Sequence, residues 1–268
     1  MIEMVDSAAQ AELARSRRLK LEWRVIVVTT LIGFLTAWEI AGRLTNPIFF
    51  APVSDVLREF WNALVDPRGQ LLHGLVETLG ILVPGFAIAS LLGVALGVLM
   101  GRSNFAYQAL DPYVTILYNI PRIALIPILL LWMGVGDLLK TTIVVLAAIF
   151  PVSVNTMVGV RDVGAQFTEP ARSMQASERQ LLWKVILPAA FPFITAGIKL
   201  ALGRALTTVI VAEFFVSVSG LGGVLHAASS SYQMARMFAP VIILSAMGIL
   251  MDAALTYLER TVLRRYRS

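Results

Sequence analysis

The sequence predicts an all-α integral membrane protein with six transmembrane helices. Hydrophobic residues make up 57% of the 268 residues and charged residues only 15%, whereas a soluble domain carries about 25% charged residues. The mean hydropathy is +0.77. A chain with so few charges cannot cover its surface in water. Because backbone polar groups must all be paired in lipid, we expect the membrane spans to be helices.

Six apolar segments are long enough to cross a hydrocarbon core, which needs about 20 helical residues. They are residues 25–44, 76–100, 113–133, 138–160, 188–215 and 239–258. We therefore divide the chain into a polar amino-terminal tail over 1–24, a first span with an outer helix over 25–71, a transmembrane core over 72–258 and a basic carboxyl-terminal tail over 259–268. The first span lacks a small-residue cleavage site, so it is expected to be a retained anchor and not a signal peptide.

The distribution of basic residues predicts the orientation. They gather in both tails and in the loop between the fourth and fifth spans, and one follows the second span; six crossings place all of these positions on one side of the membrane. The positive-inside rule makes that side cytoplasmic. The residues are Arg15, Arg17, Arg18, Lys20, Arg24, Arg102, Arg161, Arg172, Arg179, Lys184, Arg260, Arg264, Arg265 and Arg267.

Several kinds of site are excluded or disfavoured. The chain has no cysteine, which excludes disulfides and thiolate metal sites. The net charge of +5 comes from the tails and loops, so it does not indicate nucleic-acid binding. Residues 134–141 approach a phosphate-binding loop, but Leu139 replaces its second glycine and no strand precedes it. His73 and His226 stand apart from any catalytic pattern, so we do not expect an enzyme.

An outer helix is predicted after the first span. Pro52 and Val53 precede Ser54, which is expected to cap the helix at its amino end. Val56, Leu57, Phe60, Trp61 and Leu64 then fall on one helical face.

Three glycines of the second span recur every four residues, at Gly93, Gly97 and Gly101. Small residues on one face let helix backbones approach closely. We interpret this pattern as a packing surface, with a gating pivot as the alternative.

A polar segment interrupts the apolar chain between the fourth and fifth spans. It reads Glu169-Pro170-Ala171, three residues, Gln175, nine residues, and then Val185-x-Leu187-Pro188. This spacing resembles the cytoplasmic signature E-A-A-x3-G-x9-I-x-L-P of ABC-type importer permeases. Further segments are similar to the nitrate/sulfonate/taurine class of these permeases: 121–127, 130–136, 150–156, 202–214 and 220–223. Together the resemblance covers about 72–258.

The resemblance implies a type I ABC importer permease fold with a cytoplasmic coupling helix between helices four and five. This helix docks into a groove of an ATPase subunit in the family. The expected docking residues are Thr168, Glu169, Pro170, Ala171, Arg172, Met174 and Gln175.

The residues at the start of this segment agree with the capping and charge preferences of a helix amino terminus. Thr168 is a plausible cap, and Glu169 in the first turn suits the positive end of the helix dipole. Pro170 replaces the family alanine but is tolerated in a first turn. Gln175 replaces the family glycine. If that position needs a positive φ, a non-glycine residue costs about 1–2 kcal/mol; otherwise Gln175 must find a polar contact with the partner.

The family also implies the partners. We expect a second, identical permease subunit to complete the path, two cytoplasmic ATPase subunits to bind Mg-ATP, and an extracytoplasmic solute-binding protein to deliver the substrate. No cofactor is expected in this chain. The resemblance places the protein in a bacterial inner membrane, crossing it several times, and implies a small anionic solute.

Polar residues inside the spans are candidates for the translocation path. A charged group in hydrocarbon costs at least ~2.5–3.5 kcal/mol, so it should face a cavity, a partner or an interface. These groups could line a path for an anion, or they could snorkel, bridge helices or close a gate. The candidates are Tyr118, Asn119, Arg122, Lys199, Arg204 and Glu213.

The alternative function is a secondary transporter that works without an ATPase. Such a protein should show inverted repeats with broken spans at matching positions, and the sequence shows no such halves. A structural scaffold is a further alternative, but it leaves the signature segment unexplained. Co-purification with an ATPase that depends on Glu169 and Met174 separates these readings.

Overall fold

The computed structural model describes residues 2–216 and 219–267, and its regular elements there are all helical. The long helices are α1 (Ile2–Leu44), α3 (Gln70–Arg102), α6 (Asp137–Arg161), α9 (Leu187–Val216) and α11 (Met234–Arg267). The shorter ones are α2 (Val53–Val65), α4 (Asn104–Asn119), η1 (Arg122–Leu125), α5 (Ile126–Met133), α7 (Ala165–Ser173), α8 (Glu178–Leu181), η2 (Leu182–Ile186) and α10 (Gly220–Ser230).

Five helical stretches among the described residues are long and apolar enough to cross a membrane. A sixth is formed if α4 and the helices after it count as one bent span. The five are Glu22–Leu44, Gln70–Arg102, Asp137–Arg161, Glu178–Val216 and Met234–Thr261. The predicted all-helical membrane fold is therefore confirmed.

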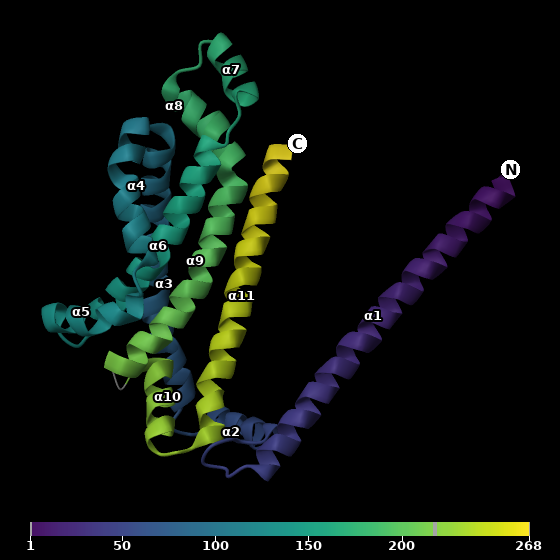
Figure 1. Cartoon of the computed structure of the whole chain (residues 1–268), viewed down its shortest axis with the longest axis vertical. Helices are drawn as coiled ribbons and strands as arrows, with labels where there is room; N and C mark the ends of the chain where they lie inside the picture. The colour runs from purple at the N-terminus through teal and green to yellow at the C-terminus, as the bar shows by residue number, and fades with distance from the viewer. Residues whose placement is uncertain (1, 217–218, 268) are drawn as a thin grey trace.

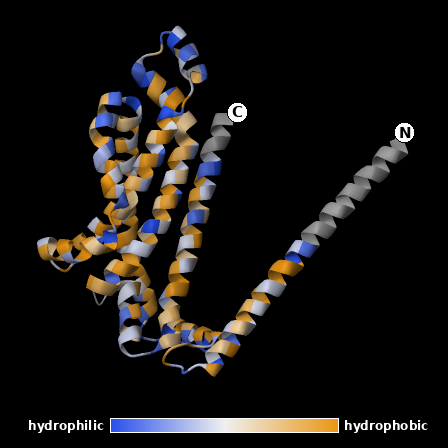
Figure 2. Cartoon of the chain, in the orientation of Figure 1, coloured by the Kyte–Doolittle hydropathy of each residue, from blue (hydrophilic) through white to orange (hydrophobic). Residues whose placement is uncertain are grey.

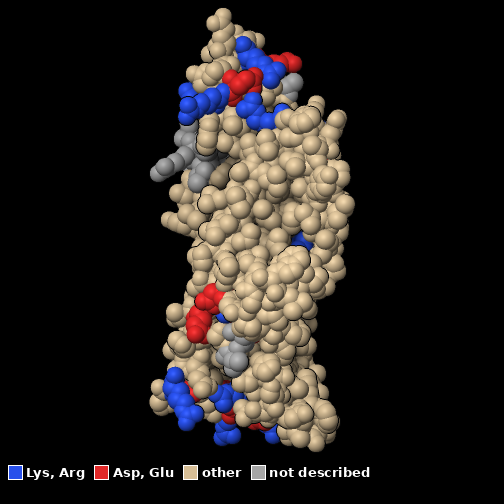
Figure 3. All heavy atoms as spheres, turned by 90° about the vertical axis from the view of Figure 1, so that its left-hand side faces the viewer, with Lys and Arg blue, Asp and Glu red and all other residues tan. Residues whose placement is uncertain are grey.

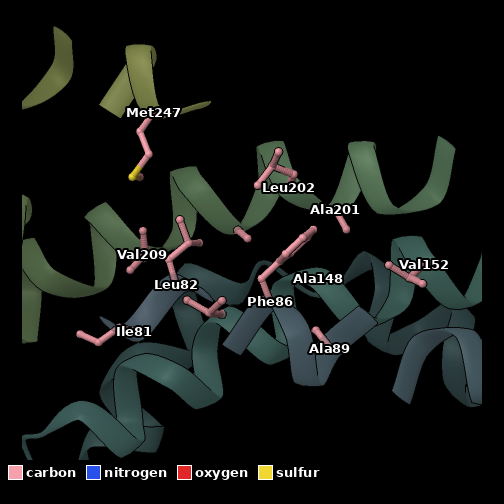
Figure 4. Packing of buried hydrophobic residues seen from close by; sticks show 12 residues of the cluster. Ile81, Leu82, Phe86, Ala89, Ala148, Val152, Ala201, Leu202, Val209 and Met247 are labelled. Carbon is pink, nitrogen blue, oxygen red and sulfur yellow. The ribbon is translucent and has the colours of Figure 1, made fainter. Parts of the chain in front are cut away.

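The centre of the bundle is the contact among α3, α6 and α9. Ala89, Ala148 and Ala201, one from each helix, are completely buried, and Figure 4 shows them facing one another together with larger apolar side chains. Met247 of α11 approaches α9 from its other side. Since lipid is as apolar as these side chains, close packing and not exclusion from water holds such helices together.

The glycine repeat of α3 lies on α6. A Cβ added at Gly97 would lie 2.5 Å from the carbonyl oxygen of Ser153, and one at Gly93 would lie 2.7 Å from the Cβ of Val152. Gly101 meets Val160 in the same way. The packing role predicted for this repeat is confirmed.

The third predicted span, 113–133, is not a continuous helix. It is broken between α4 and η1, where the chain bends by 90°, and α5 points sideways from the bundle (Figure 1). Pro121 explains the break, because it has no backbone N–H and disfavours the helical conformation of the residue before it. Ile120 accordingly takes an extended conformation, with ψ of 131°.

The outer helix forms as predicted, but its predicted cap is wrong. Pro52 occupies the cap position of α2 without a side-chain bond. The hydroxyl of Ser54 instead donates to the carboxylate of Glu39 in α1 at 2.8 Å, and its backbone N–H donates to the same carboxylate at 3.0 Å. A charged acceptor forms a stronger hydrogen bond than a neutral one, so Ser54 joins two helices. Of the predicted apolar face, Val56 is buried whereas Leu57 and Trp61 stay exposed.

Charged and polar residues lie mainly at the two ends of the bundle (Figures 2 and 3). The α7–α8 segment lies at the same end as the free ends of α1 and α11, while α2 and α10 lie at the opposite end (Figure 1). The long helices are largely apolar and α7 is largely polar (Figure 2). On the face shown in Figure 3, charged side chains gather near both ends, and the band between them is mostly uncharged.

Candidate functional site

The helix of the signature segment starts earlier than predicted. α7 begins at Ala165 after Gly164, so Thr168 is not its cap and Glu169 is not in its first turn. Pro170 lies in the sixth position and removes one backbone hydrogen bond, which explains why α7 is short. Glycine is an accepted cap residue but offers no side-chain signal. For this reason the sequence pattern favoured Thr168.

The carboxyl end of α7 shows whether the position of Gln175 needs a positive φ. Its φ is +57°, so the position of the family glycine takes the left-handed conformation here. The N–H of Gln175 donates to the carbonyl of Arg172 at 2.9 Å, and the N–H of Ala176 donates to that of Ala171 at 3.0 Å. This pair of bonds is the Schellman motif, in which glycine is usual at this position. The segment therefore carries backbone strain of about 1–2 kcal/mol.

The apolar side chains of the segment face two ways. Ala171 packs inward on the cluster around Leu181 and Ile186, whereas Met174 is 83% exposed and Phe167 is 54% exposed. Phe167 and Met174 are seven residues apart, so two helical turns bring them to one face. Phe167 was missed because the predicted helix began after it. Glu169, Pro170 and Arg172 are also exposed, and Thr168 is half-buried.

The segment is tied to the bundle by ion pairs and by continuous helix. Glu178 at the start of α8 pairs with Arg102 at the end of α3, and its other carboxylate oxygen lies 3.7 Å from Arg172. Ser177 and Gln180 form a capping box on α8. The π-turn η2 then joins α8 to α9, which makes one helical stretch, Glu178–Val216. α8 and α9 are therefore continuous, whereas α7 is joined to α8 through residues 174–177.

The second candidate site lies at the break between α4 and η1, where two arginines share one tyrosine. The guanidinium of Arg204 lies 4.6 Å from the ring centroid of Tyr118 and donates to its hydroxyl at 2.8 Å. The guanidinium of Arg122 lies 5.7 Å from the same centroid and donates to the backbone carbonyl of Tyr118. Within the described residues, neither arginine is in an ion pair.

Arg122 has both a structural bond and a spare donor. The carbonyl of Tyr118 belongs to the last turn of α4, where intrahelical partners are missing, and the guanidinium of Arg122 supplies one. The Nε of Arg122 is buried with no hydrogen-bond partner among the described residues. Sequence reasoning placed Arg122 in the middle of a continuous span, and the structure places it at the break.

The other path candidates have partners inside the chain. The Nζ of Lys199 lies 2.6 Å from the carboxylate of Glu259, so this pair bridges α9 and α11. Asn119 donates to the carbonyl of Thr115 at 2.8 Å. Glu213 is completely buried and lies about 14 Å along α9 from Arg204, at 1.5 Å per residue. Its oxygens are bonded to α3 and α10, so it does not face a solute in this structure.

Comparison with known proteins decides the family. Residues 78–264 match the family described as the binding-protein-dependent transport system inner membrane component. The chain belongs to this family. It is a multi-pass inner-membrane permease of the nitrate/sulfonate/taurine class and the non-catalytic component of an ABC importer. This family membership implies ATPase and solute-binding protein partners.

Relatives match over most of their length. The chain is 34% identical to a putative aliphatic sulfonates transport permease of Bacillus subtilis, over 86% of this chain and 83% of the relative. It is 29% identical to the taurine transport permease of Escherichia coli, over 93% and 94%. It is 30% identical to the nitrate import permease of a Synechocystis strain, over 85% of each.

A solved structure shares the fold. An inward-facing structure of the MetNI methionine ABC transporter gives a TM-score of 0.60 at 20% identity, covering 74% of this chain and 96% of that chain. At this identity the likeness supports the fold alone.

The strain at Gln175 generates a prediction. Gln175→Gly should stabilise the α7 terminus relative to Gln175→Ala by about 1 kcal/mol, because only glycine adopts a positive φ without strain. Amide hydrogen exchange at residues 175 and 176 in the purified protein measures this difference. Equal protection in the two variants would contradict the assignment of strain to this backbone angle.

Proposed function

We propose that two copies of this chain enclose a path for a small anionic solute, with both termini and the α7–α8 segment in the cytoplasm. Two ATPase subunits carrying Mg-ATP contact the α7–α8 segment, and a solute-binding protein delivers the anion to the other face. The proposal of an anionic solute rests on one observation. The guanidinium groups of Arg122 and Arg204 both contact Tyr118, and neither is paired with a carboxylate among the described residues.

Uncompensated positive charge supports an anion as the missing partner. Two guanidinium groups near one ring repel each other, and a charged group in hydrocarbon costs at least ~2.5–3.5 kcal/mol. An anion offsets both effects, and guanidinium groups match the oxygens of carboxylate, sulfonate or nitrate with paired hydrogen bonds. The relatives named for aliphatic sulfonates, taurine, nitrate and bicarbonate all handle solutes with a negatively charged oxygen group.

The exposed end of the α7–α8 segment supports the ATPase contact. Phe167 in α7 and Met174 at its carboxyl-terminal cap are exposed apolar side chains on a largely polar helix, and α7 lies at the tip of the bundle (Figures 1 and 2). Apolar side chains surrounded by polar ones are typical of protein interfaces. The rest of the proposed contact consists of Thr168, Glu169, Pro170, Arg172 and Gln175, with Ala171 packed inward behind them.

Two substitutions at Arg122 distinguish the role of its positive charge from the role of its hydrogen bond to the Tyr118 carbonyl. Arg122→Lys keeps the positive charge, whereas Arg122→Gln keeps a donor for the Tyr118 carbonyl and removes the charge. We expect uptake of a sulfonate or nitrate in proteoliposomes to fall at least tenfold for Gln and much less for Lys, with ATP hydrolysis retained in both. Arg204→Lys and Arg204→Gln should repeat the pattern.

Two outcomes would contradict a role of Arg122 in anion binding. Normal uptake by a fully assembled Arg122→Gln variant would exclude the anion role, and equal loss in the Lys and Gln variants would assign Arg122 to the guanidinium bond at the Tyr118 carbonyl.

A charge at the exposed tip tests the ATPase contact. Met174→Asp and Phe167→Asp should each abolish co-purification with the ATPase subunit, because a buried unpaired carboxylate is costly in an interface. Tyr232→Asp is the matched control, since Tyr232 is 72% exposed at the far end of the bundle. Retained co-purification in both tip variants would contradict the contact, and uptake without any ATPase subunit would favour secondary transport.

A further inference from the structure

A buried polar cluster holds the start of α10 at the end of the bundle remote from α7. Both carboxylate oxygens of Glu213 lie 2.9 Å from the hydroxyl oxygen of Thr78 in α3, which donates to them. One of these oxygens also accepts the backbone N–H of Gly222 at 2.9 Å. Glu213 and Thr78 are completely buried. The cluster therefore joins α3, α9 and α10 without access to solvent.

All three amides at the start of α10 are bonded to side chains of other helices. The N–H of Gly220 donates to the carboxylate of Glu77 at 2.6 Å, and the N–H of Leu221 donates to the Thr78 hydroxyl at 3.0 Å. The Gly222 amide is bonded by Glu213, as above. These amides have no partners within their own helix, and negative charge is favourable at a helix amino terminus. α10 is thus capped by α3 and α9 and not by its own sequence.

The cluster leaves no space for side chains at the glycines. A Cβ at Gly220 would overlap the Glu213 carboxylate, and one at Gly222 would lie 2.6 Å from the carbonyl oxygen of Ile210. Gly220 also has a φ of +74°, which L side chains rarely adopt. Leu221 between them is completely buried. The start of α10 is therefore fixed by packing as well as by hydrogen bonds.

A lysine of α6 completes the enclosure. Lys140 is only 2% exposed; its Nζ lies 3.1 Å from the hydroxyl of Ser219 and 2.8 Å from the carboxylate of Asp137. Four helices thus meet at the turn into α10.

We propose that Glu77, Thr78 and Glu213 are positioning residues that make α10 a rigid extension of α3 and α9. Because Glu178–Val216 is one helical stretch and Glu213 near its end is bonded to the Gly222 amide, a displacement of α8 is passed along α9 to α10 at the opposite face. α10 then moves with the body of each subunit and does not open separately as a gate. This inference rests on the proposed drive of α7–α8 by an ATPase.

A cross-link between α3 and α10 tests whether they separate during transport. The chain has no cysteine, so Gln70→Cys with Ala227→Cys creates a unique pair. Both residues are exposed and line the same 260 Å³ pocket between these helices. Once a bis-maleimide has joined the two cysteines, the rate of ATP-dependent uptake should stay within about twofold of the rate of the unlinked double variant. A tenfold or greater loss in the linked protein, absent from the single-cysteine variants treated alike, would overturn the proposal.

Weakening the cluster provides a second, independent readout. In Glu213→Gln the side chain keeps its size but loses its charge and one acceptor. We expect basal ATP hydrolysis and ATPase co-purification to persist while the amount of solute moved per ATP falls at least fivefold. In the Glu213→Gln variant, the cross-link between Gln70→Cys and Ala227→Cys should restore the amount of solute moved per ATP, because a covalent bond then holds α10 on α3.

A cross-linked Glu213→Gln protein that stays uncoupled would refute the positioning role. Failure of the proposed function has a different signature: the unsubstituted permease would then show no ATP-dependent uptake and no ATPase co-purification.

Discussion

A backbone polar group in a membrane bundle needs a partner, and this constraint explains the arrangement of the charged residues inside the spans. Continuous helices satisfy it by themselves, and at two of the interruptions among the described residues side chains supply the missing partners. At the break after α4, Arg122 donates to the carbonyl of Tyr118. At the start of α10, Glu77, Thr78 and Glu213 accept three backbone amides. Unsatisfied groups there would each cost several kcal/mol.

Both interruptions contact α9 beyond the closely packed centre around Ala201, at Arg204 and at Glu213, on the side toward α10. Alanines and glycines bring α3, α6 and α9 into close contact, which leaves these helices little freedom to slide separately. The stretch Glu178–Val216 passes through this centre, from the signature segment at one end to α10 at the other. This close packing supports the proposed movement of each subunit as one body.

Much of this architecture was predictable from the sequence, because long apolar segments and a glycine repeat in α3 depend on local patterns. The break at Pro121 was not predicted, because proline is also common in continuous membrane helices. Gly164 has no side chain to mark a helix start, so the first turn of α7 and the exposed Phe167 were missed. Glu213 was assigned to the path because its partner Thr78 lies 135 residues away in the chain, and because Gly222, although only nine residues away, bonds through a backbone amide that no side chain marks.

The most direct test of rigid transmission is a distance measurement within one subunit. Spin labels at Arg179→Cys in α8 and Ala227→Cys in α10 would be placed in one copy of the assembled transporter, and their separation measured by pulsed electron paramagnetic resonance with and without ATP. Rigid transmission predicts an unchanged distance within the copy. In a second sample, with Ala227→Cys alone labelled on both copies, it predicts a nucleotide-dependent change in the distance between the copies. A nucleotide-dependent change within one copy would contradict it.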